Sequence, residues 1–315
     1  MCGISGILSN IDIDYHKYIS KMTNSLGHRG PDNTSIKVSK DFSFGHNRLS
    51  IIDLNERSNQ PFIDNDDELI IVYNGEFYNF KEIRKEIGDK YYFKTASDTE
   101  VLLAGYKIFG EKILDKINGC FAFAIYNKKL KKLFFARDRL GIKPFYYALV
   151  NNVFLFSSEI RAIIATEIVS NNISKRGLSQ YLEFQSSHAP TTIIEDIKLL
   201  EPATFGVFDH KKLSINLQKY WSMTVNEKTL LGKSKTFYIK AVKEKVISAV
   251  DSRMLADVNI AAFLSGGIDS SIIVAAMSEL NDNSINTFSL VHDQNVYDES
   301  IYSDLIAKIY RTNHY

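Results

Sequence analysis

The order of strand-like and helical segments changes once along this chain, and that change limits the folds it can adopt. Short apolar strand candidates crowd the first half, and helical stretches at 80–87 and 98–106 interrupt them. The strand candidates are residues 4–8, 42–52, 69–73, 120–126, 133–136, 145–148 and 153–156. Because strands and helices do not alternate strictly here, we expect a layered α+β domain with antiparallel sheets.

From about residue 237 the pattern alternates strictly, as in a parallel sheet with crossover helices. We expect helices at 237–254, 270–280 and 298–310, and strands at 258–264 and 285–290. A covered doubly wound sheet usually has about four to six strands, so we expect this second domain to be incomplete. The predicted organisation is a first domain at 1–210, a linker at 211–234 and a second domain at 235–315, with the boundary in the polar stretch 224–235.

Charge and cysteine content exclude several classes of function. The 38 basic and 37 acidic side chains nearly cancel, so no net field attracts nucleic acid or an anionic membrane. Two cysteines, Cys2 and Cys120, are too few for a disulfide framework and are typical of a reducing compartment. The first residues lack the basic stretch and apolar segment of a signal peptide, so we expect none, and no apolar run approaches the roughly 18 residues of a membrane span. We therefore expect a cytoplasmic enzyme.

Cys2 can carry a nucleophile and a base on one residue. If Met1 is removed, which the small Cys2 side chain permits, the thiol and a free α-amine share one carbon skeleton. An α-amine has a pKa of about 7.7–8.0, so it can accept the thiol proton near neutral pH. Taken alone, however, a cysteine at position 2 is more often a bystander than a nucleophile.

A second chemical signal is the loop 263–271, which lies between a predicted strand and a predicted helix. Gly266 and Gly267 let backbone amides approach an anion, and the helix N-terminus favours negative charge. No lysine follows the glycines, so the loop is not of the Walker A type, and Asp269 is the candidate for holding Mg²⁺ near phosphates. The structural alternative is a tight turn capped by Ser and Asp.

Three further positions have both a structural and a functional interpretation. Arg48 can bind a carboxylate or lie on the polar face of a strand. Asn74-Gly75 can supply oxyanion donors, although the dipeptide is typical of a type I′ hairpin turn. Asp98 can contact a substrate or cap the helix that follows. Local sequence favours the structural interpretation at all three positions.

These positions also form an ordered set of motifs. The motifs are Cys2-Gly3-Ile4-Ser5-Gly6, His28-Arg29-Gly30-Pro31-Asp32, Arg48-Leu49-Ser50-Ile51, Asn74-Gly75-Glu76-Phe77-Tyr78-Asn79, Ser97-Asp98-Thr99-Glu100, Arg137-Asp138-Arg139-Leu140-Gly141-Ile142-Lys143-Pro144, Ser158-Glu159 and Leu264-Ser265-Gly266-Gly267-Ile268-Asp269-Ser270-Ser271. In order and spacing, from residue 2 to the last residue, the chain resembles the glutamine-dependent asparagine synthetases.

The resemblance implies a fold and a reaction for the first domain. The fold would be an N-terminal-nucleophile hydrolase sandwich with α/β/β/α layers. Cys2 would attack the side-chain amide of glutamine, and Asn74 with the Gly75 amide would form the oxyanion hole. Arg48 would hold the α-carboxylate of glutamine, and Glu76 and Asp98 its α-ammonium. The full set of glutamine-binding residues implied is Arg48, Leu49, Ser50, Ile51, Ile52, Asn74, Gly75, Glu76 and Asp98.

For the second domain the resemblance implies the start of an α/β parallel-sheet domain of the pyrophosphatase-loop type, similar to adenine nucleotide α-hydrolases. ATP, as co-substrate with Mg²⁺, would adenylate aspartate, and ammonia from the first site would displace AMP. The ATP-binding residues implied are Leu264, Ser265, Gly266, Gly267, Asp269, Ser270 and Leu290, with Asp269 as the Mg²⁺ ligand. A homodimer formed through the first domain is a further expectation.

Three alternatives remain at this point. The acceptor can be a sugar acid of surface-polysaccharide synthesis instead of aspartate. The chain can be a sugar-phosphate or phosphoribosyl amidotransferase, which shares the first domain only; the loop 265–271 opposes this. It can also be a non-enzymatic remnant that pairs with an intact subunit. We expect the glutaminase half to be complete. We also expect the 315-residue chain alone to make little or no asparagine from aspartate, ATP and ammonia.

Overall fold

The chain divides into two units, Met1–Met223 and Thr224–Tyr315, which are described separately. The computed structural model describes residues 1–224, 232–281, 283–291 and 298–315. The expected linker, 211–234, is too long, because Ser214–Lys219 forms strand β12 and pairs with β11 of the first unit. Residues 225–231 of that linker lie outside the described residues.

The first unit contains two six-stranded sheets, in which every pair of neighbouring strands is antiparallel. The first sheet has the order β10-β8-β9-β1-β3-β2. Its strands are β1 (Gly3–Ser9), β2 (Asn33–Val38), β3 (Phe42–Arg48), β8 (Tyr146–Val150), β9 (Val153–Ser157) and β10 (Lys198–Leu199). β1 lies between β3 and β9 and is buried along its whole length, so Cys2 directly precedes an interior strand. The strand predicted at 42–52 ends at Arg48, and the chain continues as a loop.

The second sheet has the order β12-β11-β7-β6-β5-β4. Its strands are β4 (Phe62–Ile63), β5 (Leu69–Phe77), β6 (Gly119–Asn127), β7 (Lys132–Arg137), β11 (Thr204–Asp209) and β12 (Ser214–Lys219). β5 and β6 pair from Leu69↔Asn127 to Phe77↔Gly119. Asn74 and Gly75 therefore lie inside β5, and the expected type I′ turn there is wrong, because pairing with a distant strand overrides the local turn preference.

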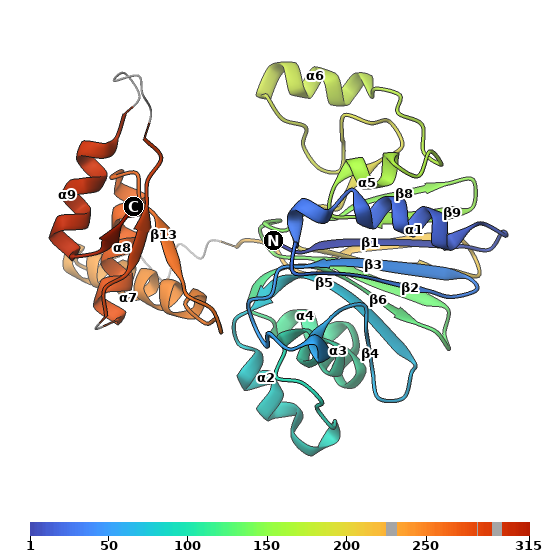
Figure 1. Ribbon diagram of the computed structural model, residues 1–315, viewed down its shortest axis with the longest axis horizontal. Coiled ribbons are helices and arrows are strands. Elements are labelled where there is room, and N and C mark those ends of the chain that lie inside the picture. Colours follow the sequence, from blue (N-terminus) through green and yellow to red (C-terminus); the bar gives the residue numbers. More distant parts are fainter. Residues whose placement is uncertain (225–231, 282, 292–297) are drawn as a thin grey trace. The chain divides into compact units, whose positions relative to one another are not determined.

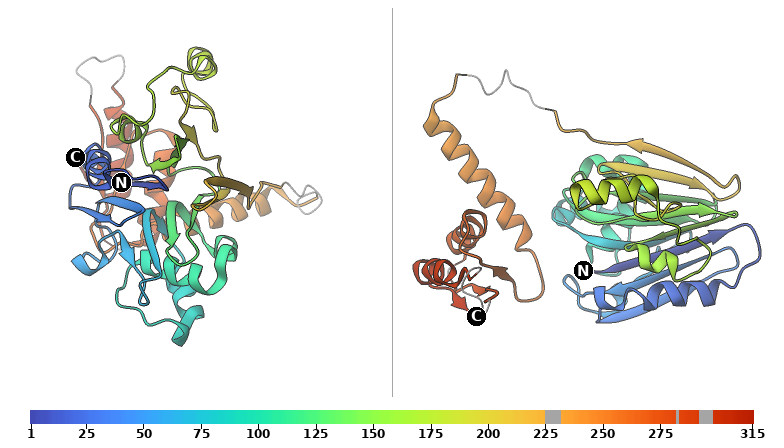
Figure 2. Two further views of the ribbon diagram at one scale, coloured as in Figure 1. Left: turned by 90° about the vertical axis from the view of Figure 1, so that its right-hand side faces the viewer. Right: turned by 90° about the horizontal axis from the view of Figure 1, so that it is seen from above.

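The two sheets face each other across a core of aromatic and aliphatic side chains, and helices cover both outer faces (Figures 1 and 2). Phe44 and Phe156 of the first sheet and Phe135 of the second are completely buried in this core. The helices of this unit are α1 (Tyr15–Asn24), α2 (Phe80–Ile87), α3 (Asp98–Phe109), α4 (Ile113–Lys116), α5 (Ile160–Ile164) and α6 (Lys175–Phe184). With α1 and α5 on the first sheet and α2 to α4 on the second, the predicted α/β/β/α sandwich is confirmed.

The second unit alternates helices and strands as the sequence predicts. Its elements are α7 (Lys235–Arg253), β13 (Ala261–Phe263), α8 (Ile268–Leu280), β14 (Asn286–Phe288), α9 (Ser300–Tyr310) and β15 (Asn313–His314). The strands are parallel, in the order β13-β14-β15. The third strand was missed because two residues are too few to show a pattern. In the part of the chain described, no helix is long and apolar enough to cross a bilayer.

Candidate active site

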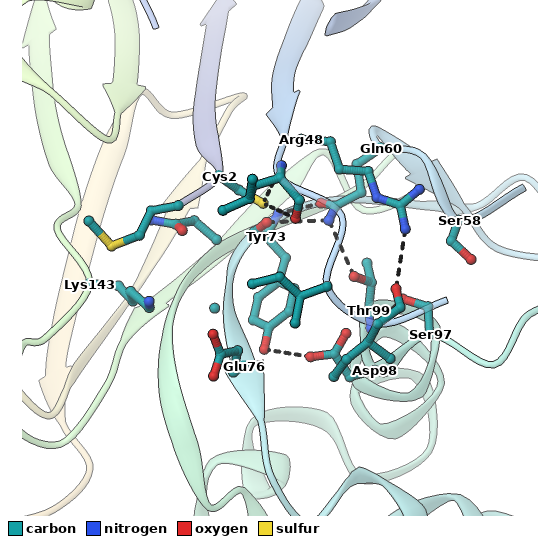
Figure 3. Close-up of a pocket in the computed structure, with 16 residues that line it drawn as sticks. Cys2, Arg48, Ser58, Gln60, Tyr73, Glu76, Ser97, Asp98, Thr99 and Lys143 are labelled. Atoms are coloured by element: carbon teal, nitrogen blue, oxygen red, sulfur yellow. Dashed lines mark hydrogen bonds between the residues drawn. The ribbon is translucent and has the colours of Figure 1, made fainter. Parts of the chain in front are cut away.

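A cavity in the first unit brings Cys2 together with residues from both sheets and from α3 (Figure 3). It lies beside the start of β1, the end of β3, the second half of β5 and the first turn of α3. Its lining residues are Met1, Cys2, Arg48, Leu49, Ile51, Ile52, Ser58, Gln60, Tyr73, Asn74, Gly75, Glu76, Ser97, Asp98, Thr99 and Lys143. All catalytic candidates and eight of the nine glutamine-binding candidates are thus gathered at one place.

The thiol of Cys2 contacts the backbone of Leu49. The Leu49 N–H donates to Cys2 Sγ at 3.4 Å, and Sγ lies 3.6 Å from the Leu49 carbonyl oxygen. Burial raises the pKa of the Cys2 thiol, although the Leu49 N–H and the terminal amine oppose the shift. Burial also lowers the pKa of the terminal amine, which here belongs to Met1. A protonated thiol and an unprotonated amine are the pair that proton transfer between them requires.

Arg29 holds the backbone of Cys2 in place. Its Nε donates to the Cys2 carbonyl at 2.9 Å, and its Nη1 donates to Glu159 Oε1 at 2.9 Å. Glu159 also pairs with His28 and Arg161. Although burial opposes it, the hydrogen bonds from Arg29 and His28 hold the pKa of Glu159 below its ordinary value. The motifs at 28–32 and 158–159 therefore meet at the residue that carries the thiol.

Asn74 and Gly75 present polar groups to the cavity from an interior strand. The Asn74 side chain is buried, and its Nδ2 has no hydrogen-bond partner within the described residues. An unmatched buried donor costs about 1–3 kcal/mol, so this amide gains when a negative oxygen enters the cavity. A Cβ at Gly75 would come within 2.5 Å of the Cys120 carbonyl oxygen and 2.6 Å of Tyr73 Cε2. Only glycine fits at this position.

Asp98 is a buried carboxylate on the opposite side of the cavity from the terminus. Its Oδ2 accepts hydrogen bonds from the Tyr73 hydroxyl at 3.0 Å and the Phe77 N–H at 3.2 Å. Burial raises the pKa of Asp98 to about 6, and these hydrogen bonds oppose the rise. The expected capping role is wrong: Ser97 is the N-cap of α3, and its hydroxyl accepts the Thr99 N–H at 3.1 Å.

The resemblance assigns the glutamine ammonium to Asp98, so replacing Tyr73 with phenylalanine should weaken glutamine binding. The change removes a hydrogen bond to a charged group, worth about 1.5–3 kcal/mol, and raises the pKa of Asp98 further. We expect KM for glutamine to rise about tenfold with a smaller effect on kcat. Because protonated Asp98 cannot hold an ammonium group, we expect kcat/KM to fall as the pH drops through about 6, and we expect this fall to lie at higher pH in the variant.

The measurement is the pH profile of glutamine hydrolysis by the variant and by a matched control. Tyr106→Phe is that control, because Tyr106 lies on the same helix α3 but does not line the cavity. Equal KM values and equal profiles for Tyr73→Phe and Tyr106→Phe would show that Tyr73 does not act through Asp98.

Arg48 organises the loop that follows β3. Its Nη1 donates to the Asn55 carbonyl at 2.9 Å and to Asn59 Oδ1 at 2.8 Å. Its Nη2 donates to the carbonyls of Ile52 at 3.2 Å and Asp53 at 2.5 Å. The four Nη hydrogens thus fix the loop 49–59 beside the cavity. The sequence did not reveal this structural role of Arg48. A role in binding a substrate carboxylate stays a prediction.

Ser50 is the one glutamine-binding candidate that does not line the cavity. Its backbone N–H donates to Asp32 Oδ2 at 2.7 Å, on the exposed side of the loop. Its neighbours Leu49 and Ile51 do line the cavity. Ser50 therefore lies in the loop between two lining residues but does not itself line the cavity.

Sequence reasoning gave no site role to several lining residues: Ser58, Gln60, Tyr73, Ser97, Thr99 and Lys143. Gln60 shows why. Its Oε1 accepts the Tyr73 N–H at 2.6 Å, and its Nε2 donates to the Tyr73 carbonyl at 3.3 Å and to Thr99 Oγ1 at 3.2 Å. These hydrogen bonds of Gln60 join three segments that are far apart in the sequence, so no local pattern predicts them. Lys143 was visible within the motif 137–144, but without a role.

In the second unit, the loop before α8 forms a compact group of donors. Ser265 Oγ and Ser270 Oγ are 3.1 Å apart, and the Gly267 N–H donates to Ser265 Oγ at 3.4 Å. Gly266 has a φ of +78°, and a Cβ there would lie 2.4 Å from Tyr302 Cβ. Glycine is therefore required at 266, and the loop fits closely against α9 while its donors surround the N-terminus of α8.

A hollow beside this loop contains part of the predicted ATP site. Its lining residues are Phe263, Leu264, Ser265, Ser270, Phe288, Ser289, Leu290, Glu299 and Ser303. Leu264, Ser265, Ser270 and Leu290 of the predicted set line it, whereas Gly266, Gly267 and Asp269 lie on the adjoining loop. No group of three or more His, Cys, Asp or Glu suited to a metal occurs in the described parts of the chain. Mg²⁺ at Asp269 stays a prediction.

Comparison with known proteins assigns both units. A glutamine amidotransferase domain family matches residues 1–221, and an asparagine synthase family matches residues 241–315. A putative glutamine-hydrolysing asparagine synthetase 2 from Methanocaldococcus jannaschii is 37% identical, over 100% of this chain and 64% of the relative. Asparagine synthetase 1 from Bacillus subtilis is 36% identical, over 95% of this chain and 47% of the relative. The chain thus spans about half to two thirds of the length of these relatives.

Among solved structures, glutamine phosphoribosylpyrophosphate amidotransferase from B. subtilis matches with a TM-score of 0.52 at 16% identity. The match covers 88% of this chain and 64% of that protein. At this identity the likeness concerns the fold, and it agrees with the layered sandwich of the first unit.

Proposed function

The chain belongs to the glutamine amidotransferase family, in the form joined to an asparagine synthase domain, and we propose that its first unit releases ammonia from glutamine with Cys2 as nucleophile. The observation that carries the proposal is one cavity that contains the Cys2 thiol, the unmatched amide of Asn74 and the buried carboxylate of Asp98. Nucleophile, oxyanion donor and ammonium acceptor are the three groups that hydrolysis of a glutamine amide needs.

The reaction proceeds through a thioester. After removal of Met1, the α-amine of Cys2 takes the proton from the thiol, and the thiolate attacks the side-chain amide carbon of glutamine. The negative oxygen that forms is bound by Asn74 Nδ2 and the Gly75 amide. The amine returns its proton to the departing nitrogen, which leaves as ammonia when the carbon–nitrogen bond breaks. Water then hydrolyses the thioester to glutamate and restores the thiol.

Charge complementarity selects free glutamine. The substrate is a zwitterion, so its recognition requires groups of both signs. Asp98 and Glu76 line the cavity as anions, and Arg48 lines it as a cation. We assign the α-ammonium to the two carboxylates. We assign the α-carboxylate to the positive charge of Arg48, whose Nη groups already hold the loop, and to backbone groups of Leu49, Ile51 and Ile52.

For the second unit we propose activation of the aspartate side-chain carboxylate by ATP. The carboxylate attacks the α-phosphorus, pyrophosphate leaves, and ammonia then displaces AMP to give asparagine. The serine and glycine loop at the start of α8 suits the pyrophosphate end of ATP, and the apolar hollow beside Leu264 and Leu290 suits its adenosine. Asp269 would hold Mg²⁺, which screens the phosphate charges. We place this chemistry in the cytoplasm and expect a homodimer.

The proposal is tested by labelling and turnover together. The purified chain should lack Met1 by mass spectrometry and should convert glutamine into equal amounts of glutamate and ammonia. An electrophilic glutamine analogue should add one equivalent at Cys2 and none at Cys120, because Cys120 is buried. Labelling at Cys120, or no glutamine-dependent ammonia from a folded chain without Met1, would contradict the first-unit mechanism. Aspartate-dependent exchange of pyrophosphate into ATP tests the acceptor.

A further inference from the structure

The loop 138–143 after β7 is fixed by the carboxylate of Asp138. Four backbone N–H groups donate to this side chain, which is 1% exposed. They belong to Phe121 at 3.2 Å, Leu140 at 3.1 Å, Ile142 at 2.9 Å and Lys143 at 2.9 Å. The Phe121 bond ties the loop to β6, in the sheet that also carries Asn74 and Gly75. The loop therefore has little freedom relative to the cavity.

Arg137 fixes the same loop through its carbonyl groups. Its guanidinium donates to the carbonyls of Gly141 at 2.6 Å, Lys143 at 2.8 Å and Leu200 at 2.5 Å. Gly141 has a φ of +68°, which lets the chain turn tightly at this point. Both the N–H and the carbonyl of Lys143 are thus bonded to buried side chains. The backbone position of Lys143 does not depend on its own side chain.

The Lys143 side chain is left to face the cavity. It lines the cavity together with Met1, Cys2 and Glu76 (Figure 3). Its ammonium makes no ion pair with any residue that the structure describes. Arg29, the other cation beside the terminus, has Glu159 at 2.9 Å as its counter-charge. Among the described residues, Lys143 and Arg48 are thus the cations of the cavity without an ion pair, and the Nη groups of Arg48 are bonded to the loop 49–59.

We propose that Lys143 is a positioning residue that keeps the N-terminal amine in its unprotonated, basic form, a role that rests on the proposed glutaminase function. A fixed positive charge disfavours a second positive charge nearby, so it favours the neutral amine. The charged and titratable groups that act on the Met1 amine are Cys2, Arg29, Lys143 and Glu76, and Arg48 and Asp98 also face Cys2 from the cavity wall. Burial lowers the pKa of the terminal amine most, Arg29 and Lys143 lower it further, and Cys2 and Glu76 oppose them.

A role for Lys143 at the amine would connect the motif 137–144 to the active site. In the hydrogen bonds described above, Lys143 is the one cavity-lining residue that Asp138 and Arg137 contact. Removing Met1 moves the amine by one residue to Cys2, which lines the same cavity as Lys143. The amine that acts in catalysis thus stays in the cavity that the Lys143 side chain also lines.

The test measures the amine by two independent readouts in Lys143→Met, Lys143→Arg and Lys143→Glu. Only two cysteines occur in the chain, so [¹³C,¹⁵N]cysteine labelling gives NMR signals from Cys2 and Cys120 alone, and the Cys2 signals report the pKa of its amine. The acid limb of kcat/KM for glutamine reports Asp98 and the amine together in the free enzyme, so the NMR titration assigns any shift to the amine. Lys211→Met, an exposed lysine outside the cavity, is the matched control.

We expect the amine pKa and the acid limb to rise by about half a unit to one unit in Lys143→Met. The rise should be larger in Lys143→Glu and absent in Lys143→Arg and Lys211→Met. Unchanged amine signals in both Lys143→Met and Lys143→Glu would overturn the inference. So would a rise in KM for glutamine without a pKa shift, which would assign Lys143 to substrate binding. Because the NMR titration needs no turnover, it decides the point even if the unsubstituted chain shows no glutaminase activity, an outcome that would count against the proposed function instead.

Discussion

Cys2→Ala should lower the rate of glutamine hydrolysis by about 10⁴-fold or more, the size of loss expected when a covalent nucleophile is removed. No other thiol can replace it. Cys120 is buried on β6, where the Tyr78 hydroxyl donates to its Sγ at 3.3 Å. Alanine is small enough for Met1 still to be removed, so the base remains while the nucleophile is lost.

The same change should leave the first unit folded. The thiol contacts only the backbone of Leu49 in its described hydrogen bonds, and Arg29 holds the Cys2 carbonyl rather than its side chain. We expect the thermal unfolding midpoint to change by no more than a few degrees, the shift caused by about 1 kcal/mol or less. Glutaminase activity that persists in folded Cys2→Ala would refute the mechanism.

Cys120→Ala is the control for the first prediction. It deletes the other thiol, so the remaining label from an electrophilic glutamine analogue must lie on Cys2. Because Cys120 packs in the core, this variant is expected to lose stability while it keeps its labelling stoichiometry. The two variants thus separate loss of chemistry from loss of packing.

The pattern of strand and helix candidates predicted an α+β layered first unit, but not the positions of its candidate active-site residues. Asn74-Gly75 shows the reason. Locally the dipeptide is typical of a hairpin turn, whereas nine consecutive pairs with β6 keep it extended inside β5. Strand pairing depends on residues about 50 positions away, which no local preference contains. The oxyanion candidates were found through the motif set and not through their secondary structure.

Other parts of the site depend on contacts that only the fold creates. Gln60 bridges Tyr73 to Thr99, and Arg48 closes the loop 49–59 through carbonyl groups that carry no sequence signature. In contrast, the loop around Gly266 could be predicted, because its strand, glycines and helix are consecutive and a positive φ there needs glycine. Local motifs can be predicted from a sequence, whereas cavities assembled from distant loops cannot.

Asn74→Ala should lower kcat for glutamine hydrolysis by about 10²–10³-fold, with KM changed much less. The Asn74 amide is buried, and its Nδ2 finds no partner among the residues described. It therefore carries an unmet desolvation cost in the resting state, which is relieved when the oxyanion forms. An interaction made only in the transition state affects kcat rather than substrate binding.

The stability of the variant tests the same prediction independently. Removing an unmatched buried donor costs little, so Asn74→Ala should unfold at nearly the same denaturant concentration as the unsubstituted chain. Asn47→Ala is the matched control: Asn47 is equally buried on β3, but its Nδ2 donates to Thr34 Oγ1 at 3.0 Å and it does not line the cavity. That variant should lose about 1 kcal/mol of stability and keep kcat within tenfold. If Asn74→Ala instead loses stability and keeps its kcat, the amide is a packing residue and the oxyanion must be held elsewhere.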